Sequence, residues 1–290
     1  KAIELDPEYG DAFNNRGLSK YELKDFKGAI KNYNKAIEID PKNSYAFTNR
    51  GLSKYNLKDY VGAIEDNSKA IELDPKDSDA FNNRGSAKYE FKDYEGAIED
   101  YSKAIELDPE YSDAFNNRGI AKYELKDYEG AIEDYSKAIE LDPENEDIFF
   151  NRGKSKIKAD FDLFDVIYDY ETAIKINPNK SSFYTERGYV KSQLNDLWGG
   201  INDFETAIRI NPKDDLALIN RCLSKFKLNQ YEKALFDCNK AIELNPKGGS
   251  NGYYFKVRGD VNIKLGKDKE ARLDYQEARS KGFEMEEIIF

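Results

Sequence analysis

The chain has 290 residues, of which 35% are charged, and its 45 basic and 56 acidic side chains give a formal net charge of −11. It contains no histidine, which excludes Ser-His and Cys-His nucleophiles and the usual imidazole metal ligand. Two cysteines are too few for a four-thiolate zinc site, and the negative charge disfavours nucleic acid and anionic membranes as main partners. No apolar run approaches the roughly 20 residues of a transmembrane helix.

The excess acidic charge is confined to the first half of the chain. Residues 1–145 carry 21 basic and 32 acidic side chains, whereas residues 146–290 carry 24 of each. This composition is typical of a soluble chain without a disulfide framework, and it favours the cytoplasm without fixing the compartment. The first residue is Lys1 rather than methionine, so we expect the sequence to be a piece of a longer protein.

The dominant pattern is a repeat of 34 residues. Successive prolines are separated by 34 residues six times and by 35 residues once. The eight prolines are Pro7, Pro41, Pro75, Pro109, Pro143, Pro178, Pro212 and Pro246. Residues 78–111 and 112–145 are identical at all but three positions. A fixed period of this length predicts a solenoid of stacked repeats.

Each repeat is predicted to contain two helices joined by a short turn. In residues 78–111 the first helix begins with an N-cap at Ser78 or Asp79 and runs to about Phe91. Asp93 caps the second helix, whose apolar residues recur at helical spacing. The proline ends that helix because it cannot donate the next amide hydrogen bond. One such hairpin cannot bury its apolar face alone, so the repeats must stack.

The spacing of aromatic, glycine and alanine residues resembles the tetratricopeptide repeat. In residues 78–111 the pattern consists of Phe81, Gly85, Ala97, Tyr101, Ala104 and Pro109. The resemblance implies an all-α fold, an α-solenoid in which stacked antiparallel helix pairs form a right-handed superhelix.

The same pattern sets the expected repeat boundaries. We expect repeats at residues 10–43, 44–77, 78–111, 112–145, 146–180, 181–214 and 215–248, with a degenerate eighth repeat at 252–282. An insertion in residues 247–254 displaces the eighth repeat, and the fifth carries its extra residue in the turn at residues 158–162. Residues 1–9 are expected to end a preceding repeat, and residues 283–290 to begin a further helix.

Two positions of the first helix depart from the family pattern. The residue before the glycine is arginine in every repeat: Arg16, Arg50, Arg84, Arg118, Arg152, Arg187, Arg221 and Arg258. The residue three after the glycine is lysine, except for Asn262 in the eighth repeat. The second helix carries a matching aspartate, except for Asn32 in the first. We interpret these residues as ion pairs between helices; the alternative is an arginine stripe that binds acidic ligands.

The resemblance also places a row of asparagines on the concave wall of the superhelix. They lie two residues before the glycine: Asn15, Asn49, Asn83, Asn117, Asn151 and Asn220. Glu186 interrupts the row. An amide can both donate to and accept from a peptide unit, and the row is similar to the asparagine ladder of O-GlcNAc transferases. The alternative is that these amides bond the backbone of the neighbouring repeat and only hold the stack.

Further residues are expected on the same wall. They are Asn14, Asn82 and Asn116 beside the row, and Tyr21, Tyr55, Tyr89 and Tyr123 farther along the helices. Acidic residues flank them at Asp11, Asp79, Asp113, Asp147, Glu22, Glu90 and Glu124, and we expect several of these aspartates to be helix caps. The charge favours a neutral or basic extended partner. It disfavours the acidic tails bound by chaperone-clamping members of the family, whose lysine positions are occupied here by residues such as Leu18 and Asp79.

Cys222 and Cys238 replace the usual glycine of the first helix and the aromatic residue of the second helix in the seventh repeat. These positions are expected to lie near one helix–helix contact. A disulfide is one alternative, and two small buried thiols are the favoured interpretation.

These features predict a non-enzymatic scaffold that binds an extended peptide or partner protein in its concave groove. We expect no catalytic residue, no cofactor, no metal, no nucleic-acid partner and no insertion into a membrane. One alternative is the recognition arm of a larger enzyme or signalling protein. Another is a scaffold that self-associates end to end, because no polar capping helix is evident at either end.

Overall fold

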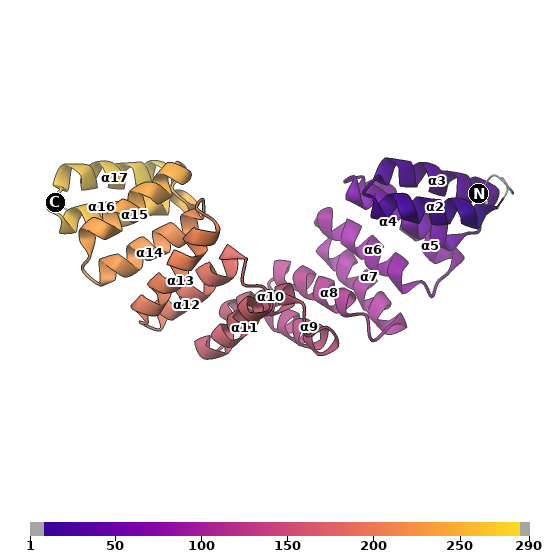
Figure 1. Ribbon diagram of the computed structural model, residues 1–290, viewed down its shortest axis with the longest axis horizontal. Helices are drawn as coiled ribbons and strands as arrows, with labels where there is room; N and C mark the ends of the chain where they lie inside the picture. Colours follow the sequence, from indigo (N-terminus) through magenta and orange to yellow (C-terminus); the bar gives the residue numbers. More distant parts are fainter. Residues whose placement is uncertain (1–8, 285–290) are drawn as a thin grey trace. The chain divides into compact units, whose positions relative to one another are not determined.

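The computed structural model describes residues 9–284, and within this range the chain is entirely helical (Figure 1). The predicted all-α class is confirmed. The sixteen α-helices form eight consecutive pairs: α2 (Gly10–Glu22) and α3 (Phe26–Ile39), α4 (Ser44–Asn56) and α5 (Tyr60–Leu73), α6 (Ser78–Glu90) and α7 (Tyr94–Leu107), α8 (Ser112–Glu124) and α9 (Tyr128–Leu141), α10 (Glu146–Lys158) and α11 (Leu163–Ile176), α12 (Ser181–Gln193) and α13 (Leu197–Ile210), α14 (Asp215–Lys227) and α15 (Tyr231–Leu244), α16 (Tyr253–Lys264) and α17 (Asp268–Ser280).

One helix pair lies in each range where a repeat is expected. A short 3-10 helix, η1 (Ser250–Gly252), occupies the predicted insertion before the eighth pair. Residues 1–8 of the expected preceding repeat and residues 285–290 of the expected further helix lie outside the described part. None of the helices described is both long enough and apolar enough to cross a membrane.

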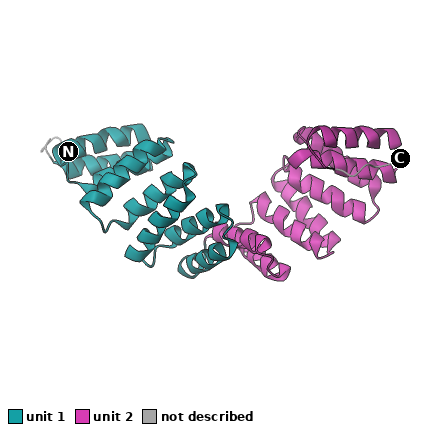
Figure 2. Cartoon of the chain, turned by 180° about the vertical axis from the view of Figure 1, so that it is seen from behind, with its two compact units in different colours: residues 1–144 teal, residues 145–290 magenta. Residues whose placement is uncertain are grey.

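The chain divides into two compact units (Figure 2). Unit 1 comprises residues 1–144 and contains α2–α9, and unit 2 comprises residues 145–290 and contains α10–α17. Within each unit, each helix packs against the next helix along the chain.

The first helices of successive pairs also contact one another. In unit 1, α4 contacts both α2 and α6, and in unit 2, α14 contacts both α12 and α16. Successive second helices make no comparable contact among the described residues. The first helices therefore lie on the inside of each unit's curve. We call the surface that they share the inner face of that unit.

Aspartates cap most of the second helices. The Asp93 side chain accepts a hydrogen bond from the backbone of Gly96 at 3.1 Å, which confirms the predicted cap. The first helix of the same repeat is capped by Asp77, which accepts from Ala80 at 3.0 Å. The prediction of Ser78 or Asp79 is therefore wrong, because both residues already belong to the first turn of α6.

The turn between the helices of a pair contains a residue in the left-handed region. Lys92 has a φ of 62°, and Gly266 holds the same place in the eighth pair with a φ of 68°. Residues 159–162 link α10 to α11, one residue more than the 125–127 linker of the preceding pair. The extra residue of the fifth repeat thus lies in the turn, where it leaves both helices intact.

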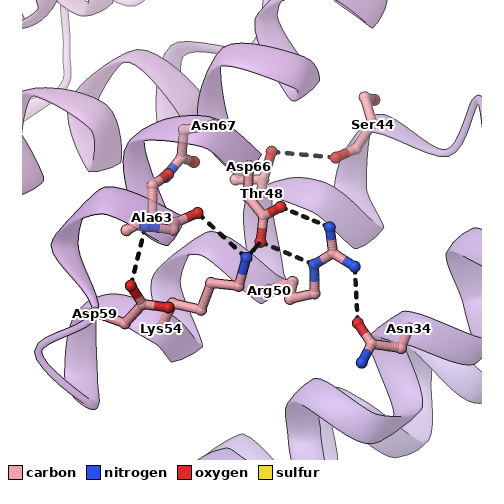
Figure 3. Close-up of polar contacts among 10 residues, drawn as sticks. Asn34, Ser44, Thr48, Arg50, Lys54, Asp59, Ala63, Asp66 and Asn67 are labelled. Carbon is pink, nitrogen blue, oxygen red and sulfur yellow. Dashed lines mark hydrogen bonds and ion pairs between the residues drawn. The ribbon is translucent and has the colours of Figure 1, made fainter.

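A buried ion pair joins the two helices of a pair to each other and to a third helix (Figure 3). Asp66 on α5 is 4% exposed and accepts from Arg50 at 2.6 and 2.8 Å. Lys54, one turn farther along α4, lies 2.8 Å from the same carboxylate. The remaining guanidinium nitrogen of Arg50 donates to Asn34 on α3 of the preceding pair at 2.7 Å. One arginine therefore connects three helices.

The cluster recurs along both units, which confirms the predicted ion pairs. The further pairs are Arg84–Asp100, Arg118–Asp134, Arg152–Asp169, Arg187–Asp203, Arg221–Asp237 and Arg258–Asp274. The guanidinium groups of six of the arginines also lie over an aromatic ring, as Arg84 does over Phe81 at 5.5 Å; the six are Arg16, Arg50, Arg84, Arg118, Arg152 and Arg187. Because the guanidinium donors are engaged inside the protein, the arginines are not arranged as a stripe for acidic ligands.

Two repeats depart from this pattern, and in each of them another contact replaces the missing one. In the first repeat Asn32 replaces the aspartate, and Lys20 turns instead to Asp25 at 2.8 Å. In the eighth repeat Asn262 replaces the lysine and donates to Asp274 at 2.9 Å. The lysine therefore enters the cluster only where a second anionic oxygen receives it.

The packing of each pair depends on a small residue facing a large one. A Cβ added to Gly85 would lie 2.8 Å from the ring of Tyr101, so glycine is required there. In the seventh repeat the same two positions are Cys222 and Cys238, whose Cα atoms are 5.6 Å apart and whose sulfurs are bonded. The interpretation as two free thiols is therefore wrong, because the positions face each other within bridging distance.

Helix α17 differs from the other second helices on the side where a following repeat would pack. Leu235 and Ile242 of α15 are partly buried against a core cluster that includes residues of α16. At the corresponding places α17 carries Arg272 and Arg279, both exposed.

Replacing Asp100 by alanine is expected to lower the free energy of unfolding by about 3 kcal/mol, because Arg84 and Lys88 then lose a shared, buried carboxylate. Lys88→Asn copies the natural eighth repeat and is expected to lower it by less than about 1 kcal/mol. Urea denaturation of the two variants measures the difference, and equal losses would contradict the role given to the aspartate.

Replacing Cys222 by glycine and Cys238 by tyrosine restores the pair found in most other repeats, so the variant should fold without a disulfide. Reduction of the wild type removes a bridge between residues 16 apart and should cost about 3 kcal/mol of stability. Thermal denaturation with and without reductant tests this expectation. A reductant effect on the variant as large as that on the wild type would show that the bridge is not the cause.

Candidate functional site

All thirteen residues predicted to bind peptide lie on first helices, in two separate sets. Unit 1 carries Asn14, Asn15, Asn49, Asn82, Asn83, Asn116, Asn117, Tyr21, Tyr55, Tyr89 and Tyr123 on α2, α4, α6 and α8. Unit 2 carries Asn151 on α10 and Asn220 on α14.

Some asparagines of the row join neighbouring repeats. Asn49 donates to the side-chain oxygen of Asn14 at 3.2 Å, and Asn117 donates to that of Asn82 at 3.1 Å. Each bond links an asparagine of the row to a residue of the preceding repeat, namely the one that immediately precedes that repeat's own member of the row. These two contacts are between side chains and not to the backbone, but they do hold the stack.

Other asparagines of the row form no side-chain hydrogen bond with another residue of the described chain. They are Asn15 and Asn83 in unit 1 and Asn151 and Asn220 in unit 2. Two of them face a threonine at the place where Asn49 and Asn117 face an asparagine. Thr48 and Thr185 stand where Asn83 and Asn220 would find a partner, and each hydroxyl donates instead to an aspartate, Asp77 or Asp214, at 2.8 and 2.9 Å. Asn116 differs, because its side-chain oxygen is buried without a partner among the described residues.

The four tyrosines form a row of ring pairs in unit 1. Tyr55 packs on Tyr60 and Tyr89 on Tyr94, with centroids 5.6 and 5.3 Å apart. Tyr21 and Tyr123 pair in the same way with Phe26 and Tyr128. All four tyrosines are only partly buried, so the row retains amphipathic contact area.

Glutamates of the next repeat border these rings. The Tyr55 hydroxyl donates to Glu90 at 3.5 Å, and burial followed by the charge of Glu90 raises the pKa of Tyr55. Burial followed by the charge of Glu124 raises the pKa of Tyr89 to about 12. Both tyrosines therefore stay neutral near pH 7 and present hydroxyl groups beside carboxylates.

Three of the aspartates predicted to be caps instead accept a hydrogen bond from the last residue of their own repeat. Asp79 accepts from the hydroxyl of Tyr111 at 2.8 Å, and Asp147 from Lys180 at 2.8 Å. Asp11 accepts from Asn43 at 3.5 Å. These residues lie within first turns, one or two residues past the true caps, which explains why the sequence pattern misplaced them.

The inner face of unit 2 contains two adjacent hollows. The first has a volume of about 270 Å³, and its lining includes Tyr189, Gln193, Asn220, Leu223, Lys227 and Tyr253. The second, of about 750 Å³, shares Asn220 and Tyr253 with the first and adds apolar surface from Leu216, Ile219 and Phe283. Tyr253 lies within the insertion at residues 247–254, so the insertion was the signal in the sequence that could have identified it.

Within residues 9–284 no group of three or more histidine, cysteine, aspartate or glutamate side chains is arranged to hold a metal ion. The two cysteines are bonded to each other. The chemistry offered by the inner faces is therefore hydrogen bonding by amides, contact with tyrosine rings and carboxylate charge.

The two kinds of asparagine are expected to differ in their effect on stability. Asn117→Ala removes the bond to Asn82 and leaves a buried acceptor without a partner, which should lower the free energy of unfolding by about 1 kcal/mol. Asn83→Ala breaks no bond to a described residue and should leave stability unchanged or slightly raised, since alanine favours helices. Denaturation curves of the two variants distinguish them, and a larger loss from Asn83→Ala would refute the assignment.

Several solved structures are similar to this chain, and one of them is described as a tetratricopeptide repeat protein. YrrB, described as a TPR protein with an unusual peptide-binding site, is 24% identical over 63% of this chain and 94% of its own, with a TM-score of 0.56. PilF of Pseudomonas aeruginosa is 21% identical over 70% of this chain and 92% of its own, with a TM-score of 0.64. A chain of the Cut9–Hcn1 hetero-tetramer of the APC/C is 16% identical over 89% of this chain and 50% of its own, also with a TM-score of 0.64. At these identities the likeness concerns the fold alone.

No curated protein matches the chain. Family models do match it. The model described as TPR repeat matches residues 17–58, 85–126 and 121–158, and the model described as Tetratricopeptide repeat matches residues 44–77 and 216–247. Together these matches cover more than half of the sequence, and the helix pairs in the structure agree with them. The chain belongs to the tetratricopeptide repeat family.

Proposed function

We propose that this chain is a non-enzymatic scaffold that binds an extended segment of a partner protein along the inner faces of its units. The observation that carries the proposal is the set of asparagine amides that recur at one position of the first helices without a partner in the described part of the chain. Asn83 in unit 1 and Asn151 and Asn220 in unit 2 are partly buried members of this set.

An amide at this position suits a peptide backbone. It offers two donors and one acceptor, so it can bond both the N–H and the C=O of one peptide unit whatever the side chain. Because a partly buried amide without a partner is unfavourable, a bound peptide unit would relieve that cost. An extended chain has no internal hydrogen bonds, so its backbone groups are available to these amides.

The hollows of unit 2 would supply side-chain contacts beside the backbone contacts. Asn220 lines both hollows, so a segment held by its amide would pass between them. Tyr189 is 40% exposed and Tyr253 is 36% exposed, which leaves aromatic surface for an apolar side chain. Such anchors contribute most of the binding energy in many peptide complexes.

The charge of unit 1 favours a neutral or basic segment there. Glu90 and Glu124 border the tyrosine rings, and an acidic partner would be repelled by them. The family relationship and the YrrB description as a TPR protein with a peptide-binding site support a role in protein binding.

End-to-end self-association is the less favoured alternative. Stacking of a second copy on α17 would bury Arg272 and Arg279, where the earlier repeats present leucine and isoleucine to their neighbour. Taking two charged side chains out of water opposes such a contact. Sedimentation at rising concentration separates a monomer from a chain of copies.

Selection of random decapeptides on the chain is expected to enrich binders whose affinity falls at least tenfold in the double variant Asn83→Ala/Asn220→Ala, because two backbone-binding amides are lost. Asn202→Ala, an exposed change on second helix α13, is the matched control and should leave affinity unchanged. Affinities are measured by fluorescence anisotropy. The absence of any enriched peptide, or equal affinities in the double variant and the wild type, would refute the proposed function.

A further inference from the structure

Glu186 occupies, on α12, the position that asparagine holds on α10 and α14 of the same unit. Its side chain is partly buried and forms no hydrogen bond or ion pair with another residue in the described part of the chain. A carboxylate taken partly out of water without a donor is unfavourable, because its lone pairs are desolvated and not satisfied. The position therefore differs in kind from the asparagines on either side.

The neighbouring repeat explains why Glu186 has no partner. In unit 1, Asn49 and Asn117 find theirs in Asn14 and Asn82, the residues before the row in the preceding repeats. The corresponding residue for Glu186 is Phe150, whose ring packs on Tyr170 and Phe183 and offers no hydrogen-bonding group.

Charged neighbours do not neutralise this carboxylate by contact. The ammonium of Lys154 lies 5.8 Å from the centroid of the Phe150 ring, and Lys158 is at the exposed end of α10. Asp214, on the other side, accepts from Thr185 and adds a second negative charge. Burial raises the pKa of Glu186, and this outweighs the opposite effect of Lys154 and Lys158.

We infer that Glu186 selects a lysine or arginine side chain in the segment that binds to the inner face of unit 2. This inference rests on the proposed function and adds the chemistry of one position of the partner. A cationic side chain supplies both the missing donors and the opposite charge, and such charge-assisted bonds are stronger than neutral ones. Arginine is especially suited because its planar donors match both carboxylate oxygens.

An apolar side chain is expected close to the cationic one. Tyr189 lies three residues after Glu186 on α12, so both side chains occupy the same helix face. Tyr189 also lines the smaller hollow with Leu223 and Tyr253. A segment that reaches Glu186 with a basic residue therefore places a neighbouring residue at this hollow. The partner sequence should combine the two types within a few residues.

The test is a selection of random decapeptides on the full chain and on its Glu186→Asn variant. The variant carries the residue found at this position in six other repeats, so it should fold, and its circular dichroism spectrum checks this. With the wild type, lysine or arginine should be enriched over glutamine at one peptide position by about tenfold or more. With Glu186→Asn that preference should vanish, while peptides are still bound.

The outcomes separate this inference from the proposed function. Equal enrichment of basic residues on both proteins, or none on either while other peptides are enriched, would overturn the role of Glu186 and leave the scaffold intact. No enriched peptide on either protein would remove the proposed function together with this inference.

The pH dependence of binding gives a second readout that does not depend on removing the residue. Protonation of Glu186 removes its charge, whereas lysine and arginine in the peptide stay charged. Because the pKa of Glu186 is raised above its ordinary value of 4.5, the preference for a basic peptide over its glutamine analogue should fall as the pH is lowered from 7 toward that raised value. Glu186→Gln should show no such fall. The same fall in that variant would assign the effect to Asp214 or to another group.

Discussion

The stacking of this protein depends on one arginine in each repeat. The guanidinium reaches an aspartate on the second helix of its own pair and, in several repeats, a polar side chain on the second helix of the preceding pair, as Arg84 does with Asp100 and Ser68. Its rigid, planar set of donors makes both contacts possible at once, which a lysine would not. The arginine thus fixes the register of neighbouring repeats in addition to that of its own hairpin.

This arrangement leaves the inner faces to other residues. The ionic groups that hold the stack are satisfied within it, so an amide such as Asn83 can remain without a partner among the described residues. Whether an amide of the row is used by the stack depends on the residue that faces it. Asn14 and Asn82 accept such a bond at that place, whereas Thr48 donates to Asp77 and forms no bond with Asn83. One position can therefore be structural in one repeat and available in the next.

The residues of unit 2 extend this principle to specificity. An asparagine reads only the backbone of a peptide, because every residue offers the same peptide unit. In the proposed complex, Glu186 would contribute charge and the hollows beside Asn220 would contribute apolar contact, and these would distinguish one side chain from another. In the proposed complex the asparagines would thus provide affinity and Glu186 would provide selectivity.

The sequence alone determined the helix pairs, the family and the arginine–aspartate contacts. These features depend on residues at fixed separations within one repeat, and such separations are easily recognised because successive repeats are nearly identical. Only the tertiary structure decided which asparagines pair, that Cys222 and Cys238 are bonded, that Asp79 bridges to Tyr111, and that Tyr253 lines a hollow. These features depend on which residues of neighbouring helices face each other in space. That alignment is set by side-chain packing between helices, which the period of the sequence does not contain.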